Sequence, residues 1–185
     1  IGAQDHKRLL DKDEGPNTGG MGAYCPPPIL SAELENKIMK QILEPTIHGL
    51  RKRGIEYKGV LFAGLMVKEN QPSLIEYNIR FGDPETQALL MLMKSDFAEL
   101  LFETVNGNIK NYNLEWEKKK AITVVLANDG YPSQYNKNAE IYGIKDAEKN
   151  PSVKVFHAGT SIIDGSLTAT GGRVLNVTSI ADTLE

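Results

Sequence analysis

Glu76, Asn78 and Arg80 lie at alternating positions and have side chains suited to binding a metal ion and a phosphorylated ligand. They fall in the run 74–81, where apolar residues come between them, a pattern that predicts a β-strand with one polar face. A carboxylate and an amide oxygen on that face can bind one hard cation, such as Mg²⁺ or Mn²⁺. The guanidinium of Arg80 is suited to phosphate or carboxylate. The pattern alone is also compatible with a solvated strand face that binds nothing.

The residues around this strand predict a hairpin that leads into a helix. An apolar strand is expected over 60–67, and residues 69–72 have the composition of a turn. After Arg80, Asp83 is a good helix N-cap and Pro84 suits the first helical position. The polar strand face is therefore expected to lead to a helix N-terminus, whose backbone amides favour anions unless Asp83 itself occupies them.

Two segments near the beginning of the sequence contain further candidates. Asp5 and Lys7 would share one face of an extended chain. The segment 15–24 has four glycines within eight residues, which predicts an irregular loop with accessible backbone amides. It has neither the ending of a P-loop nor the spacing of a dinucleotide fingerprint. A surface charge cluster and an ordinary flexible loop would explain the same two patterns.

The composition is that of a globular protein and excludes several classes of partner. The chain has 185 residues, 41% of them hydrophobic, and a net charge of −3. This charge gives no reason to expect a nucleic acid or an anionic membrane as partner. No apolar run is long enough to span a membrane. The single cysteine, Cys25, rules out a disulfide within these residues and fits a reducing compartment such as the cytoplasm.

The hydrophobic pattern changes near residue 115, which predicts two domains in an α+β fold. Helices are expected first and strands afterwards. The expected helices cover 31–53, with Pro45 kinking or ending the helix, then 84–93 and 96–106; the expected strands cover 121–127, 153–156 and 173–177, with a hairpin over 161–169. The residues 179–185 have the composition of a helix start, and Ile1 takes the place of a methionine, so we expect a piece of a longer protein.

Taken in order, these motifs resemble the phosphoribosylamine–glycine ligase (glycinamide ribonucleotide synthetase) family of the ATP-grasp superfamily. The segments that carry the resemblance are 4–8, 15–24, 61–66, 76–85, 155–160 and 172–175. The resemblance extends over essentially the whole chain. The resemblance implies the C-terminal part of an ATP-grasp catalytic domain over 1–115. It also implies a small, incomplete, mostly β C-terminal domain over 116–185.

The resemblance implies a ligase that joins glycine to 5-phosphoribosylamine in purine biosynthesis, through a glycyl phosphate, and converts ATP to ADP and phosphate. Glu76 and Asn78 match the family's ligands for Mg²⁺ or Mn²⁺. Arg80 and Lys7 would be the catalytic residues, because they would stabilise the charge that develops between γ-phosphate and carboxylate. The implied substrate-binding residues are Asp5, Asn17, Thr18, Gly19, Gly20, Gly22 and Asp83.

The resemblance also implies that an N-terminal part of the same protein is needed. The family's phosphoribosylamine domain and ATP-contacting lysine have no counterpart here, so we expect these 185 residues to be inactive by themselves. Gly64 stands where many ATP-grasp enzymes have a carboxylate, so a second metal held wholly by protein is not expected. Two alternatives remain: another ATP-grasp ligase or a carboxylase that uses bicarbonate, and a non-catalytic nucleotide-binding or scaffold domain.

Overall fold

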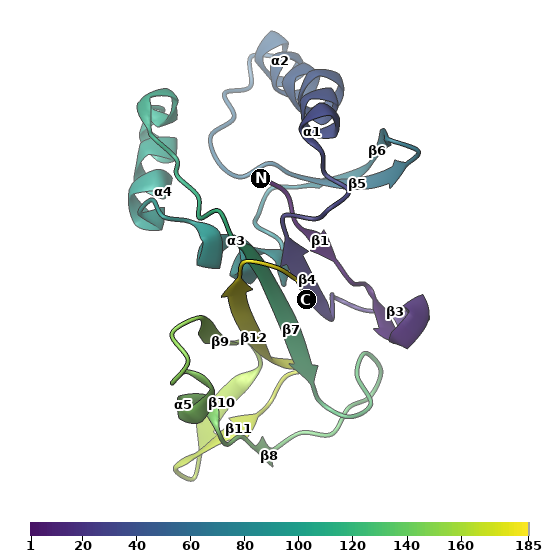
Figure 1. Cartoon of the computed structure of the whole chain (residues 1–185), viewed down its shortest axis with the longest axis vertical. Helices are drawn as coiled ribbons and strands as arrows, with labels where there is room; N and C mark the ends of the chain where they lie inside the picture. The colour runs from purple at the N-terminus through teal and green to yellow at the C-terminus, as the bar shows by residue number, and fades with distance from the viewer. Residues whose placement is uncertain (185) are drawn as a thin grey trace. The chain divides into compact units, whose positions relative to one another are not determined.

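The computed structural model describes residues 1–184 and divides into two compact units. The first unit comprises residues 1–26, 83–93 and those from 116 onward, and the second comprises 27–82 and 94–115 (Figure 1). Both units contain helices and strands, so the predicted α+β class is confirmed. The predicted division of the sequence into family domains at residue 115 stays a prediction.

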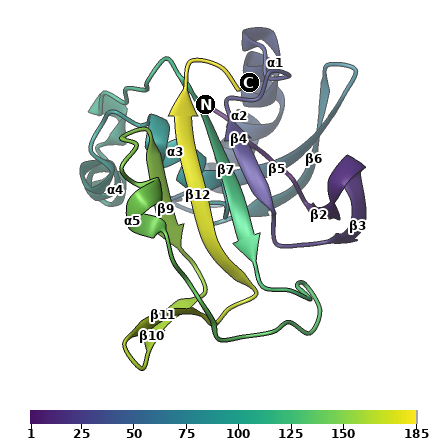
Figure 2. The ribbon, with the colours of Figure 1, turned by 60° about the horizontal axis from the view of Figure 1, so that its bottom comes forward.

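A five-stranded antiparallel sheet forms the centre of the first unit, in the order β1-β4-β7-β12-β9. Figure 2 shows β4, β7, β12 and β9 side by side in this order. Its strands are β1 (Gln4–Asp5), β4 (Gly22–Cys25), β7 (Lys120–Ala127), β9 (Val153–His157) and β12 (Arg173–Ala181). Burial alternates along β7, so one face of the sheet is packed and the other is solvated.

Helix α3 (Glu85–Leu92) packs on the sheet against β4, β7 and β12. Its residues Ala88 and Leu92 meet Cys25 and Ala121 in a fully buried cluster. Burial raises the pKa of the Cys25 thiol to about 11, so the thiol stays protonated at neutral pH. Cys25 is therefore a core residue, and its thiol donates to the carbonyl of Gly2 at 3.2 Å.

Smaller sheets complete the first unit. They consist of β2 (Arg8–Leu10) with β3 (Glu14–Asn17), and of β8 (Ala139–Glu140), β10 (Thr160–Ile163) and β11 (Ser166–Ala169), with the short helix α5 (Ile144–Ala147). The predicted hairpin between β10 and β11 is confirmed, and Asp164 and Gly165 form its turn with φ of 49° and 83°.

The second unit contains a long interrupted helix, a two-stranded ribbon and a separate helix. Its elements are α1 (Ala32–Ile38), a π segment (Met39–Leu43), α2 (Glu44–Lys52), β5 (Phe62–Lys68), β6 (Gln71–Asn78) and α4 (Phe97–Asn106). Pro45 does not end the helix, which continues through α2 to Lys52. The π segment just before Pro45 accommodates the backbone N–H that proline lacks. The hydroxyl of Thr46 also donates to the carbonyl of Ile42 at 2.7 Å.

The ribbon of the second unit begins its second strand at Gln71, whereas the sequence pattern predicts residue 74. The reason is a two-residue turn at Glu69 and Asn70, which both have positive φ. This turn lets β6 pair immediately with β5 and end at Asn78. The predicted strand over 74–81 is therefore wrong at both ends.

Two further predictions of local structure are wrong. Ser179 and Ile180 pair with Ile122 and Ala121, so β12 continues where a helix start was expected. The glycine-rich segment is irregular only over 18–21, because its two ends pair as strands β3 and β4. No helix within residues 1–184 is both long and apolar enough to cross a membrane.

Candidate functional site

The predicted site residues divide between the two units. Glu76, Asn78 and Arg80 belong to the second unit, while the other candidates, from Asp5 to Gly22 and Asp83, belong to the first. Each group is held in place by the elements of its own unit.

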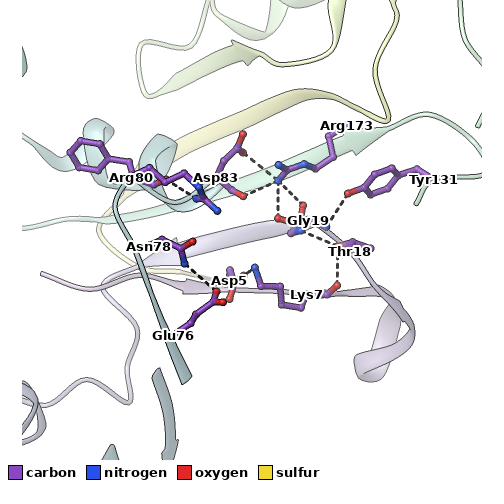
Figure 3. A network of polar contacts seen from close by, with 12 residues as sticks. Asp5, Lys7, Thr18, Gly19, Glu76, Asn78, Arg80, Asp83, Tyr131 and Arg173 are labelled. Atoms are coloured by element: carbon purple, nitrogen blue, oxygen red, sulfur yellow. Dashed lines mark hydrogen bonds and ion pairs between the residues drawn. The ribbon is translucent and has the colours of Figure 1, made fainter. Parts of the chain in front are cut away.

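Glu76 and Asn78 meet on one face of β6. The amide Nδ2 of Asn78 donates to Oε1 of Glu76 at 3.1 Å, so the polar ends of the two side chains lie next to each other (Figure 3). Gly64 pairs with Glu76 across the ribbon, and a Cβ at Gly64 would lie 3.2 Å from the Cγ of Glu76. The missing side chain at Gly64 therefore leaves the room in which the carboxylate lies.

Glu76 and Asn78 fit a cation that takes only part of its coordination from the protein. A 180° rotation of the Asn78 amide would bring its oxygen to the carboxylate side, giving two oxygen donors. Within residues 1–184, no group of three or more acidic, histidine or cysteine side chains is placed to hold a metal. Mg²⁺ commonly binds through one or two protein oxygens and takes its remaining ligands from water and phosphate.

Arg80 lies beyond the end of β6, in a bend, and does not continue the polar strand face. Its Nη1 donates to the carbonyl of Phe81 at 2.9 Å, and its side chain is exposed. The ring of Phe81 packs edge-on against Phe97 at 5.4 Å between centroids. The packing of Phe81 anchors the chain directly after Arg80 and leaves the guanidinium accessible.

Lys7 and Asp5 lie together in the first unit. The Nζ of Lys7 is 2.6 Å from Oδ2 of Asp5, and the lysine side chain is 55% exposed (Figure 3). Asp5 is fixed by pairing with Ala23 in the sheet. An anion that bound Lys7 would have to compete with the carboxylate of Asp5 for the ammonium group of Lys7.

The glycine-rich loop has no free backbone donor over residues 18–21. The N–H of Thr18 donates to Lys7 O, that of Gly19 to the Tyr131 hydroxyl, that of Gly20 to Thr18 Oγ1, and that of Met21 to His6 O, all at 2.8–3.0 Å. Phosphate loops work by presenting unpaired N–H groups. These four amides therefore do not form an anion cradle in this arrangement.

Packing within the protein also accounts for the glycines themselves. A Cβ at Gly20, which has φ of +116°, would lie 2.5 Å from Pro84 Cδ, and one at Gly22 would lie 2.7 Å from Thr123 O. Both positions thus exclude larger residues without reference to a ligand. Asn17 is different, because its side chain is exposed at the end of β3.

The sequence predicted Asp83 as the N-cap of α3, and this prediction is wrong. The helix begins at Glu85, and Pro84 precedes it without a side-chain cap. Oδ1 of Asp83 instead lies 3.3 Å from Arg173 Nη1 and accepts from Gln87 Nε2 at 3.3 Å. The carboxylate thus faces Arg173 and stays about half exposed, at 49%.

Three residues around these candidates were not singled out from the sequence. Arg173 and Tyr131 contact the glycine-rich loop from positions more than 100 residues away, which no local pattern reveals. Glu85 is 5% exposed, and its burial raises the pKa of its carboxyl, with Asp5 and Asp83 adding to the increase. An acidic residue in a first helical turn looks like an ordinary helix start from sequence.

The chain resembles enzymes of the ATP-grasp class in fold. The biotin carboxylase domain of a thermophilic 2-oxoglutarate carboxylase superimposes with a TM-score of 0.61 at 12% identity, over 97% of this chain and 38% of that one. A phosphoribosylamine–glycine ligase from Thermotoga maritima superimposes with a TM-score of 0.81 at 34% identity, over 98% of this chain and 44% of that one. The fold is thus that of part of an ATP-grasp domain followed by a C-terminal domain.

The sequence comparisons identify the family. The model of the ATP-grasp (A) domain of phosphoribosylglycinamide synthetase matches residues 1–86, and that of its C domain matches residues 121–185. A phosphoribosylamine–glycine ligase from Agrobacterium fabrum is 54% identical over 177 residues. The chain belongs to the phosphoribosylglycinamide synthetase family. That alignment includes 96% of this chain but only 41% of the length of the relative.

Proposed function

We propose that this chain is the C-terminal part of an ATP-dependent ligase that joins glycine to 5-phosphoribosylamine in purine biosynthesis. The products would be glycinamide ribonucleotide, ADP and phosphate. The observation that carries the proposal is the 54% identity, over 96% of the chain, to a relative named phosphoribosylamine–glycine ligase. Because the chain spans 41% of that relative, an N-terminal part of the same polypeptide would supply the remaining contacts.

The reaction requires two anions to approach each other, the γ-phosphate of ATP and the carboxylate of glycine. In the proposed mechanism the carboxylate attacks the phosphate to form glycyl phosphate and ADP, and the amine of phosphoribosylamine then displaces phosphate. Lys7 and Arg80 have exposed cationic ends and would stabilise the negative charge on the transferred phosphoryl group. Neither residue is expected to act as a base.

Glu76 and Asn78 would hold Mg²⁺ or Mn²⁺ at the phosphates. Their meeting at 3.1 Å and the space left by Gly64 support this assignment. When bound, the ion would offset the charge of the phosphate oxygens. The residues from Asp5 to Gly22 and Asp83 remain the proposed substrate-binding group, with contacts through exposed side chains such as Asn17 and Asp83 rather than through the amides of residues 18–21.

The proposal can be tested by joining the N-terminal part of the Agrobacterium fabrum relative to this chain; we call this protein the joined polypeptide. Phosphate release is measured with glycine, phosphoribosylamine and ATP, and with each omitted in turn. We expect release that requires all three and is abolished by Glu76→Gln. The unaltered relative controls for the N-terminal part, and Glu140→Gln, at an exposed position in β8, controls for the loss of a carboxylate.

The fold likeness to a biotin carboxylase domain makes a bicarbonate-dependent reaction the second candidate. Phosphate release that depends on bicarbonate and ignores glycine would favour this carboxylase. Turnover that survives both Glu76→Gln and Asn78→Ala would show that the polar face of β6 is only solvated. That result would favour a non-catalytic role for the ribbon.

A further inference from the structure

Arg173 and Tyr131 both reach the backbone of Gly19 from the C-terminal half of the sequence. Nη1 of Arg173 donates to the carbonyl of Gly19 at 3.0 Å, and the hydroxyl of Tyr131 accepts from its N–H at 2.9 Å (Figure 3). Both polar backbone groups of this one residue are therefore fixed. A Cβ at Gly19 would lie 3.1 Å from Arg173 Cζ and from the Tyr131 oxygen, so a larger residue would crowd both contacts.

The same nitrogen of Arg173 also holds the start of α3. It donates to the backbone carbonyl of Asp83 at 2.8 Å, while Oδ1 of Asp83 and the carbonyl of Gly20 lie further away, at 3.3 and 3.4 Å. Nη1 has two hydrogens, and the two carbonyls at 3.0 Å or less take them best. Arg173 thus fixes the backbone of Asp83 and also pairs with its carboxylate, which stays 49% exposed.

Thr18 links this contact to Lys7. Both the N–H and the hydroxyl of Thr18 donate to the carbonyl of Lys7, each at 2.8 Å. The hydroxyl also accepts from the N–H of Gly20 at 3.0 Å. Tyr131 therefore holds Gly19, and the neighbouring residue Thr18 holds the backbone of Lys7, all within the first unit.

We propose that Arg173 and Tyr131 are positioning residues, which hold Lys7 and the carboxylate of Asp83 in place for the reaction without touching the reacting atoms. The inference rests on the proposed function for the roles of Lys7 and Asp83. Misplacement of a catalytic group by about 1 Å can cost on the order of 100-fold in rate, so loss of this support has a measurable effect.

The first test needs no activity and uses the joined polypeptide. Hydrogen exchange at the Gly19 amide is measured in Tyr131→Phe, which removes only the accepting hydroxyl. We expect exchange about five- to tenfold faster, as for the loss of one hydrogen bond. Tyr142→Phe, at a position that is 79% exposed, is the matched control. Unchanged exchange at Gly19 would overturn the proposed hold on the loop.

The second test separates positioning from a purely structural role in the joined polypeptide. Tyr131→Phe and Arg173→Lys are each made in two backgrounds, one that keeps Lys7 and one that carries Lys7→Met. In each variant kcat is measured per folded molecule. We expect each change to lower kcat about tenfold when Lys7 is present. When Lys7 is absent, we expect a factor of about two or less for Tyr131→Phe, and a reduced but larger factor for Arg173→Lys, because Arg173 also holds Asp83. Equal factors in both backgrounds would overturn the proposal.

Failure of the proposed function gives a different result. If Lys7→Met leaves kcat unchanged, the catalytic role of Lys7 is wrong, and the positioning of Lys7 falls with it. If Lys7→Met lowers kcat but Tyr131→Phe and Arg173→Lys do not, only the positioning proposal is wrong. Arg173→Lys keeps the charge but lacks the planar fork, so a full activity there would contradict the proposed role of the fork in positioning.

Discussion

The guanidinium of Arg173 donates to the backbone carbonyl of Asp83 at 2.8 Å, although 90 positions separate the two residues in the sequence. This contact joins the beginning of β12 to the residue that precedes Pro84 at the start of α3. It explains why the carboxylate of Asp83 does not cap the helix, since it lies beside the guanidinium instead. The glycine-rich loop, α3 and the C-terminal strand thus meet at one cation.

Two buried threonines give the first prediction. Thr178 Oγ1 donates to Thr123 Oγ1 at 2.7 Å across β12 and β7, and both side chains are buried. Thr178→Val leaves the Thr123 hydroxyl without its partner, and we expect a loss of about 1–3 kcal/mol in the free energy of unfolding. The double variant Thr123→Val/Thr178→Val should be less destabilised than the single one, because no orphaned hydroxyl remains. Urea denaturation measures both, with Ser161→Ala as an exposed control. Costs that simply add would contradict this account.

A pair of glycines gives the second prediction. Gly20 has φ of +116° and no room beside Pro84, so we expect Gly20→Ala to lower the free energy of unfolding by about 2 kcal/mol or more. Gly49 lies within α2, and an added methyl group there would meet nothing within 4 Å, so Gly49→Ala should stabilise the chain by about 0.5–1 kcal/mol. Thermal unfolding of both variants tests the contrast. A Gly20→Ala variant as stable as the wild type would contradict the tight contact.

The fold could be predicted from the sequence where local signals agree with packing. The strand over 121–127, the hairpin over 161–169 and the helix starts near residues 31 and 96 all appear in the structure as expected. The strand over 74–81 and the helix start over 179–185 were misplaced. A two-residue turn at Glu69 and Asn70 set the start of the first, and pairing with β7 extended the second. The pairing is a tertiary contact, which a local pattern does not reveal.

The site could be predicted only in part, for the same reason. The proximity of Glu76 to Asn78 follows from a period of two, and so does that of Asp5 to Lys7. Tyr131 lies in a turn and Arg173 at a strand start, and no local pattern shows what either side chain contacts. Their roles depend on contacts made through the tertiary fold, which spacing along the sequence does not encode.

The buried carboxyl of Glu85 gives the third prediction. Burial raises its pKa above the ordinary value of 4.5, the carboxylates of Asp5 and Asp83 raise it further, and Lys7 lowers it. The folded state then binds more protons than the unfolded state, so Glu85 lowers stability as pH rises above that value. We expect Glu85→Gln to be more stable than the wild type at pH 7, with the difference fading below pH of about 4.5. Urea denaturation between these pH values measures it, with the exposed Glu140→Gln as control. A gain that is the same at both pH values would contradict the cause given.

The space at Gly64 gives the fourth prediction. A methyl group there would press on Glu76 Cγ at 3.2 Å and displace its carboxylate. We expect Gly64→Ala to weaken the binding of Mn²⁺ and ATP by the joined polypeptide about tenfold, as for changes to a ligand's support. Titration calorimetry measures the affinity, and Gly49→Ala serves as the control for an added methyl group. Unchanged affinity in Gly64→Ala would show that this space is not needed.

The location of the metal ion tests the central claim most directly. Crystals of the joined polypeptide grown with Mn²⁺ and ATP would reveal the ion by its anomalous scattering. The account predicts a peak within about 2.3 Å of side-chain oxygens of both Glu76 and Asn78, with phosphate oxygens completing its ligands. A nucleotide bound with its ion away from both side chains, in a protein that still turns over, would contradict it.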